Sequence, residues 1–144
     1  MYHLVDQPTN VLSRSGHFLL WAMRGWRHAA ERGACPPLAL HQAFTQLNLR
    51  PMLPDFHIAM ALLHHGGAVR LGFSSVDAPA ISEDEAVLLG LWRDVAADEN
   101  DKAQGTLVLL TGKETATPSL RAMRSTLAHL RCAGFDVSRL ALAH

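Results

Sequence analysis

The sequence is poor in cysteine and in net charge, and each shortage excludes a class of protein. Two cysteines in 144 residues are too few for a disulfide framework or for a zinc site made of four cysteines. Thirteen basic and thirteen acidic side chains give a formal net charge of zero, whereas a dedicated nucleic-acid-binding domain is basic. We therefore expect no nucleic-acid partner. A chain that is 49% apolar and 18% charged is also too hydrophobic to be disordered.

Long hydrophobic runs are also missing. The apolar stretch 18–23 is ended by Arg24 and Arg27, well short of the roughly 20 apolar residues that a spanning helix needs. The first twelve residues carry no lysine or arginine, unlike the start of a secretory leader. We therefore expect a cytoplasmic protein with no membrane partner, and reduced thiols at Cys35 and Cys132.

What the chain has in abundance is leucine and alanine, which both favour helix. A single tyrosine and few isoleucines argue against a β-rich fold. We predict an all-α fold, one compact domain over residues 1–144 with five or six packed helices. Residues 1–12 are predicted to be an N-terminal extension, and 98–116 an irregular or short-strand connection. The apolar spacing predicts helices over about 15–32, 36–47, 55–65, 82–97 and 117–134.

Local signals mark several helix ends. Ser13 or Ser15 is suited to cap the first helix, and Gly33 to end it in the left-handed conformation. Ser82 is followed three residues later by Glu85, the spacing of a capping box in which each side chain bonds a free backbone N–H. The sequence therefore predicts a well-defined start for the fourth helix.

Two segments are candidates for β-structure. Residues 106–111 form an apolar run that Gly112 ends, and periodicity alone does not separate a strand from a buried helix there. Residues 68–73 are a second candidate for a short β element. The alternative fold is therefore α+β, with a small βαβ unit in 106–142.

One face of the first helix combines rings with cations. His17, Trp21, Arg24 and His28 recur at spacings of four, three and four, which places them on one side of a helix. This face is a candidate pocket for a planar or anionic ligand, with Arg24 stacked on Trp21. The alternative for the same face is packing against another helix or a second copy.

Nine histidines make metal binding a hypothesis to test. His129 and Cys132 have the spacing of three that lets two helical donors reach one ion. Cys35 and His28 are candidates to complete a zinc site through tertiary folding. Only one pair has ligand spacing, so we expect no cofactor.

Charge is segregated along the chain although its sum is zero. Residues 14–70 and 102–144 each carry a net charge of +4, and residues 77–101 carry −7. Arg121, Arg124 and Arg131 lie on one face of the predicted last helix, where they are candidates to dock a phosphate or an acidic partner. Solvated faces are the alternative explanation.

The sequence contains no complete catalytic or phosphate-binding signature. Gly112 and Lys113 follow an apolar run, but Gly105 is too far upstream for a P-loop and Glu114 stands in the place of Ser or Thr. No dinucleotide fingerprint, nucleophile elbow or His-Glu-x-x-His motif is present. The helix expected at 55–65 lacks the basic and amide side chains of a DNA recognition helix.

The sequence therefore favours a non-catalytic protein. We expect a protein–protein interaction or regulatory module that binds itself as a homodimer or binds another protein. Trp21, Trp26 and Trp92 are the predicted interface anchors, since aromatic side chains concentrate interface energy. The alternative is a domain that binds a small ligand through the His17 face, or a metal through Cys35, His129 and Cys132.

Overall fold

The computed structural model describes residues 4–66 and 71–141, and its regular structure in these ranges is helical. The predicted all-α class with five or six packed helices is confirmed. Two short 3-10 helices, η2 (Thr9–Val11) and η3 (Arg50–Met52), precede α1 and α3. The α-helices are α1 (Arg14–Glu31), α2 (Pro36–Gln46), α3 (Leu53–His65), α4 (Glu83–Ala96), α5 (Asn100–Thr111) and α6 (Lys113–Cys132).

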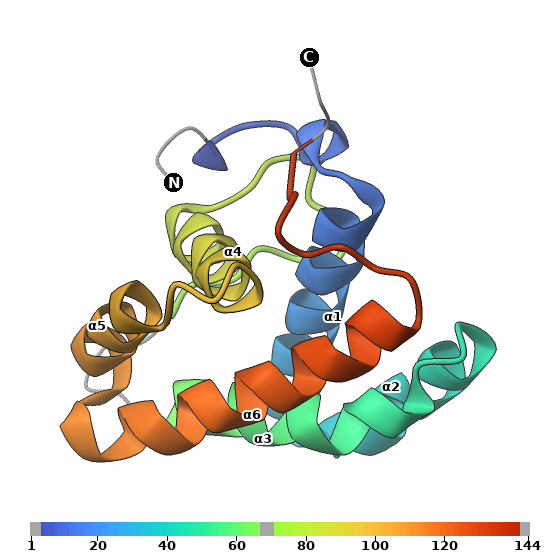
Figure 1. Ribbon diagram of the computed structural model, residues 1–144. Coiled ribbons are helices and arrows are strands. Elements are labelled where there is room, and N and C mark those ends of the chain that lie inside the picture. Colours follow the sequence, from blue (N-terminus) through green and yellow to red (C-terminus); the bar gives the residue numbers. More distant parts are fainter. Residues whose placement is uncertain (1–3, 67–70, 142–144) are drawn as a thin grey trace.

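The helices surround one hydrophobic core. The long helix α6 lies beside α3, and α5 folds back along α6 (Figure 1). Helix α1 packs against α2 and α4, and α4 contacts α5 and α6. The segment that follows α6 rises from its end and passes over α1 (Figure 1). This segment and the end of α4 border the site described below.

A row of aromatic rings runs through the core and joins four helices. Phe18 of α1 contacts Phe44 of α2 with ring centroids 5.5 Å apart, and Phe44 contacts Phe56 of α3 at 5.9 Å. Phe56 then stacks on Trp92 of α4 at 6.1 Å. Aromatic pairs at these distances are favourable beyond the area they bury, so the row fixes how the four helices meet.

The predicted helix ends are confirmed at three positions. The Ser13 hydroxyl accepts a hydrogen bond from the Gly16 N–H at 3.2 Å, so Ser13 rather than Ser15 caps α1. Gly33 follows α1 with φ 75°. Ser82 and Glu85 form the complete capping box at the start of α4. These ends follow from local chemistry, because each cap satisfies backbone groups that the helix leaves free.

The β alternatives are wrong where the structure tests them. Residues 106–111 are the second half of α5, which buries Ala103, Leu107 and Thr111 at intervals of four. Residues 67–70 lie outside the described part of the chain, and 71–73 form no strand. Residues 135–141 do not complete a βαβ unit either. The β pairing among the described residues consists of two isolated bridges, Pro8 with Ala80 and Leu12 with Ala141.

The predicted irregular connection 98–116 is also wrong, because helix occupies most of it. Gly112 separates α5 from α6 with φ 87°, a backbone conformation that glycine adopts without strain. Helix α6 therefore begins at Lys113 and includes Pro118 in its second turn. A proline there removes one helical hydrogen bond, and the helix continues through it.

Two non-helical segments are packed rather than free. The predicted N-terminal extension buries Leu4 and Leu12, and the Asp6 N–H donates to the Ile81 carbonyl at 2.8 Å. The segment after α6 lies close to α1, since a Cβ at Gly16 would lie 2.7 Å from the Leu140 carbonyl oxygen. The Ser13 hydroxyl donates to the Arg139 carbonyl at 2.6 Å, which ties the segment to the start of α1.

No helix in the described ranges is both long enough and apolar enough to cross a lipid bilayer.

Candidate functional site

The fold places the four residues of the predicted ligand face of α1 in different surroundings. Arg24 is 3% exposed and points toward α4, where its Nε donates to Glu85 Oε2 at 2.7 Å and its Nη2 to Oε1 at 2.9 Å. The two parallel bonds make a bidentate ion pair between residues that are far apart in sequence. Arg24 is therefore occupied by a carboxylate of the protein itself.

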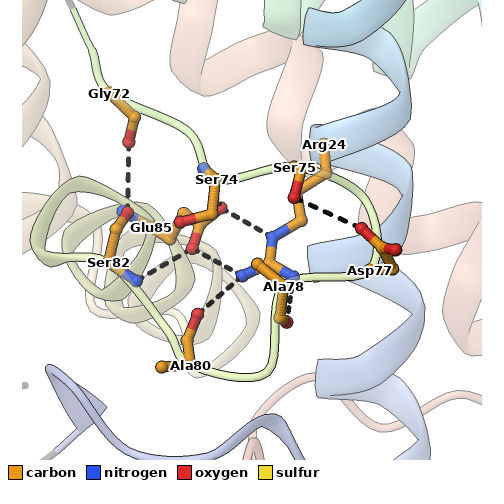
Figure 2. Close-up of polar contacts among 9 residues, drawn as sticks. All are labelled: Arg24, Gly72, Ser74, Ser75, Asp77, Ala78, Ala80, Ser82 and Glu85. Carbon is orange, nitrogen blue, oxygen red and sulfur yellow. Dashed lines mark hydrogen bonds and ion pairs between the residues drawn. The ribbon is translucent and has the colours of Figure 1, made fainter.

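The Arg24–Glu85 pair also holds the segment 71–82 in place (Figure 2). Arg24 donates to the carbonyl oxygens of Ala78 and Ala80, both at 2.9 Å. Glu85 accepts from the backbone N–H groups of Ser74 and Ser82, at 3.0 and 2.9 Å. The pair thus bonds to four backbone groups, so a buried charge network is satisfied throughout.

The charge state of Glu85 follows from these contacts. Burial by itself would raise the pKa of the carboxyl. The hydrogen bond from Arg24, the bonds from the Ser82 and Ser74 N–H groups and the Arg24 charge outweigh it and hold the pKa below its ordinary value. Glu85 is therefore ionised at neutral pH, and the network acts as a structural clamp rather than as an acid–base pair.

The other members of the α1 face do not share the buried position of Arg24. His17 and His28 are exposed, and Trp21 is half-buried against Phe18 and Phe44 at ring distances of 6.2 and 6.3 Å. None of the four residues lines either cavity described below. The packing alternative explains this face better than a ligand pocket does.

Two further side chains of α1 make contacts that the sequence did not indicate. Trp26 Nε1 donates to Nδ1 of His57 at 3.0 Å, and burial, with a smaller effect of the nearby His65, lowers the pKa of His57. Arg27 binds Glu31 at 2.7 Å and the Leu71 carbonyl at 3.0 Å. These bonds join α1 to α3 and to the segment after α3.

The predicted metal donors are only partly brought together. Cys35 and Cys132 are free thiols, as expected. His129 and Cys132 line a cavity of about 470 Å³ together with Arg14, and Cys35 is not among its lining residues. His129 Nε2 lies 3.6 Å from Asp55 Oδ2. Within the described ranges no group of three or more His, Cys, Asp or Glu is placed to hold a metal ion.

The structure brings two of the three predicted arginines of the last helix to one cavity. Arg124 and Arg131 line a second cavity of about 210 Å³, whereas Arg121 does not. The two lie two turns apart on α6, about 10 Å along the helix axis, and both are exposed. Neither guanidinium has a carboxylate oxygen within 4 Å among the described residues. Two of the three predicted anion-binding residues thus line one cavity, and the charge of one of them, Arg131, acts on Asp136 beyond ion-pair distance.

Three elements form this cavity, which we call the α6 cavity. Helix α6 supplies Arg124 and Arg131, the turn after α4 supplies Asp98, and the segment after α6 supplies Asp136 and Ser138. Buried apolar side chains also line the cavity, and we call them its floor. The floor consists of Val95, Leu127, Phe135 and Val137.

The acidic residues of the α6 cavity are held in defined positions. Asp98 follows α4 with φ 59°, and its N–H donates to the Val95 carbonyl at 3.1 Å. The Asp136 carboxylate accepts from the N–H and hydroxyl of Ser138. Mainly through the Ser138 hydroxyl, and with the charges of Arg139 and Arg131, these contacts lower the pKa of Asp136. Asp136 is therefore ionised at neutral pH.

The sequence pattern predicted the two arginines of this cavity but neither its acidic residues nor its apolar floor. The spacing of Asp136 and Ser138 is a local signal for an Asx turn, but it does not say what the turn faces. Asp98 and Val95 approach α6 only through tertiary packing.

The comparisons with known proteins assign no family. No family model matches the chain, and searches of curated proteins and of solved structures find no significant match.

Proposed function

We propose that this protein is a non-catalytic binding module for a small organic acid. The observation that carries the proposal is the pair Arg124 and Arg131, which line one cavity together with apolar side chains. Neither guanidinium has a carboxylate oxygen within 4 Å among the described residues. A guanidinium binds a carboxylate through two parallel hydrogen bonds. The floor would hold the carbon chain of the same ligand.

The size of the α6 cavity limits the ligand. Its volume of about 210 Å³ is below the range of roughly 300–1,000 Å³ that is typical of drug-sized ligands. A compact acid with a short branched chain fits this space.

The lining of the α6 cavity argues for binding without chemistry. A general base needs a pKa near the working pH and a nucleophile needs an activating partner. No histidine, cysteine or lysine among the described residues lines the cavity, and the Ser138 hydroxyl donates to an ionised Asp136. We therefore assign no catalytic role and no cofactor to this site.

Titration with small acids tests the proposal. We expect isocaproate, leucine or another acid of four to six carbons to shift the NMR signals of residues 95–98, 124–131 and 135–138 in a saturable way. Replacing Arg124 or Arg131 by glutamine should weaken binding by about tenfold, because a hydrogen bond to a charged group contributes about 1.5–3 kcal/mol.

Arg121→Gln is the matched control for this titration, since Arg121 is exposed on the same helix and lies outside the cavity. It should leave the affinity within about twofold, since an exposed charge contributes little. Equal losses in all three variants would mean nonspecific attraction to a basic helix. The absence of saturable shifts with every acid up to tens of millimolar would refute the binding function.

Self-association is a second candidate function, supported by two apolar side chains on α5. Leu109 is 82% exposed and its neighbour Val108 is 37% exposed. Of the three interface anchors predicted from sequence, Trp26 and Trp92 do not support it, because they are fully buried. The third, Trp21, is half-buried. We therefore propose that any homodimer forms through α5, with a second copy of this chain covering Leu109.

Light scattering of a surface variant tests the dimer. Leu109→Glu should convert a dimer into a monomer at tens of micromolar, since a buried unpaired charge in an interface is unfavourable. Leu38→Glu is the control, because Leu38 is also largely exposed, at 76%, on the separate helix α2. A monomeric parent protein at the same concentration would exclude the dimer.

The cellular location belongs to the same proposal. Cys35 and Cys132 are both exposed and unpaired, as expected for a protein that works where thiols stay reduced. We propose the cytoplasm as that compartment.

A further inference from the structure

The α6 cavity carries both signs of charge, and the two signs come from different walls. Arg124 and Arg131 belong to α6, whereas Asp98 follows α4 and Asp136 lies in the segment after α6. A cleft with charges of fixed sign on its walls orients a charged ligand by its field. A ligand with a single negative charge would leave Asp98 without a cation, whereas the charges of Arg131 and Arg139 already act on Asp136.

Both acids keep acceptor capacity for a ligand. Asp98 makes no ion pair within 4 Å among the described residues. At Asp136 the bonds from Ser138 go to one oxygen, Oδ1, and no hydrogen bond is found to Oδ2 within the described ranges. A carboxylate accepts about four hydrogen bonds in all, so an ammonium group has acceptors on these two walls.

We propose that the ligand of the α6 cavity is a zwitterion, an α-amino acid with a short apolar side chain. This inference rests on the proposed function, since it specifies the ligand of the same site. The ligand carboxylate would bind Arg124 and Arg131, and its ammonium group would bind Asp98 and Asp136. The apolar side chain would lie on the floor that includes Leu127 and Phe135.

Three compounds with the same branched hydrocarbon chain separate the charges of the ligand. Leucine carries both charged groups, isocaproate lacks the ammonium and isopentylamine lacks the carboxylate. Calorimetry at low salt, with the intact protein, should show leucine binding at least about tenfold more tightly than either truncated compound, because each truncation leaves a charged wall unpaired.

Two conservative variants locate the ammonium contact. Asp98→Asn suits the left-handed backbone at this position, and Asp136→Asn retains an oxygen for Ser138. Each should weaken leucine binding by about fivefold or more and leave isocaproate binding unchanged or tighter. Asp101→Asn is the control, because Asp101 is exposed on α5 and lies outside the cavity.

The outcomes separate this inference from the proposed function. If isocaproate binds as tightly as leucine, with the expected loss in Arg124→Gln, the acid-binding function stands and the zwitterion inference is overturned. The inference also fails if Asp101→Asn weakens leucine binding as much as the cavity variants do. If none of the three compounds binds, the proposed function itself fails.

Discussion

Replacing Arg24 by methionine is expected to lower the free energy of unfolding by about 3–5 kcal/mol, the cost of breaking a buried ion pair from one side. Glu85 is 0% exposed, so the variant leaves a carboxylate in the interior without its cation. The backbone carbonyls of Ala78 and Ala80 lose their donor as well. Because a whole domain is stable by only about 5–15 kcal/mol, urea unfolding should show a large shift in midpoint.

A double variant shows whether the loss comes from the unpaired charge. Arg24→Met combined with Glu85→Leu removes both charges, so it should be more stable than Arg24→Met alone. Arg93→Met is the control, since Arg93 is partly exposed and pairs with Asp94 at 3.3 Å. Its cost should stay within about 1 kcal/mol. A double variant as unstable as the sum of the two single variants would contradict the clamp.

The same network should make stability depend on pH. The pKa of Glu85 lies below its ordinary value of 4.5 in the folded protein, so the unfolded chain binds the proton more tightly. The stability that the pair contributes is therefore present above pH 4.5 and is lost as the pH falls below it. Arg24→Met should lack this part of the acid dependence in urea unfolding.

Truncating the centre of the aromatic row should have a comparable effect. Phe56 is 0% exposed and its ring lies between those of Phe44 and Trp92. Phe56→Ala is expected to lower the free energy of unfolding by about 3–5 kcal/mol, because the variant loses buried apolar surface and leaves a cavity between four helices. Urea unfolding followed by circular dichroism measures the change.

Ile58 offers the matched control on the same helix. Its side chain is 47% exposed, so Ile58→Ala should change stability by about 1 kcal/mol or less. If Phe56→Ala also stayed below about 1 kcal/mol, the row of rings would not be the centre of the core. If both variants lost about 3 kcal/mol, helix α3 itself rather than its buried face would be the sensitive element.

Local chemistry made much of this fold predictable. The cap at Ser13, the left-handed Gly33 and the capping box of Ser82 and Glu85 each depend on residues within one turn. Apolar spacing then placed α1 to α4 within about two residues of their ends. These features are local, so one sequence is enough to predict them.

Helix α5 escaped prediction for a physical reason. Its buried positions Ala103, Leu107 and Thr111 do follow a helical spacing. Val108 and Leu109 are exposed but apolar. The run therefore contains apolar residues at buried and exposed positions alike, and its sequence shows no helical periodicity. Its first residue also lacks a side-chain cap. The helix predicted over 117–134 begins four residues too late. Proline is common at the start of a helix, whereas Pro118 lies in the second turn of α6.

The pairing of Arg24 with Glu85 could not be predicted from the sequence. Arg24 belonged by spacing to a face of rings and cations, and Glu85 already had a local role in the capping box. In the structure Glu85 performs that role and binds Arg24 as well. The α6 cavity shows the same limit, because its arginines share a helix while Asp98 and Asp136 reach them only through packing.

The segment after α6 lines part of the cavity, and this position has a consequence for amide hydrogen exchange. Residues 135–141 lie outside the helices, and few of their N–H groups are bonded within the described ranges, so their amides should exchange quickly with solvent. A bound ligand would link this strip of chain to α4 and α6. Deuterium uptake there should slow with occupancy, while the amides at the middle of α3 keep their rate. Exchange measurements thus report ligand binding from the backbone alone, without any label on the ligand.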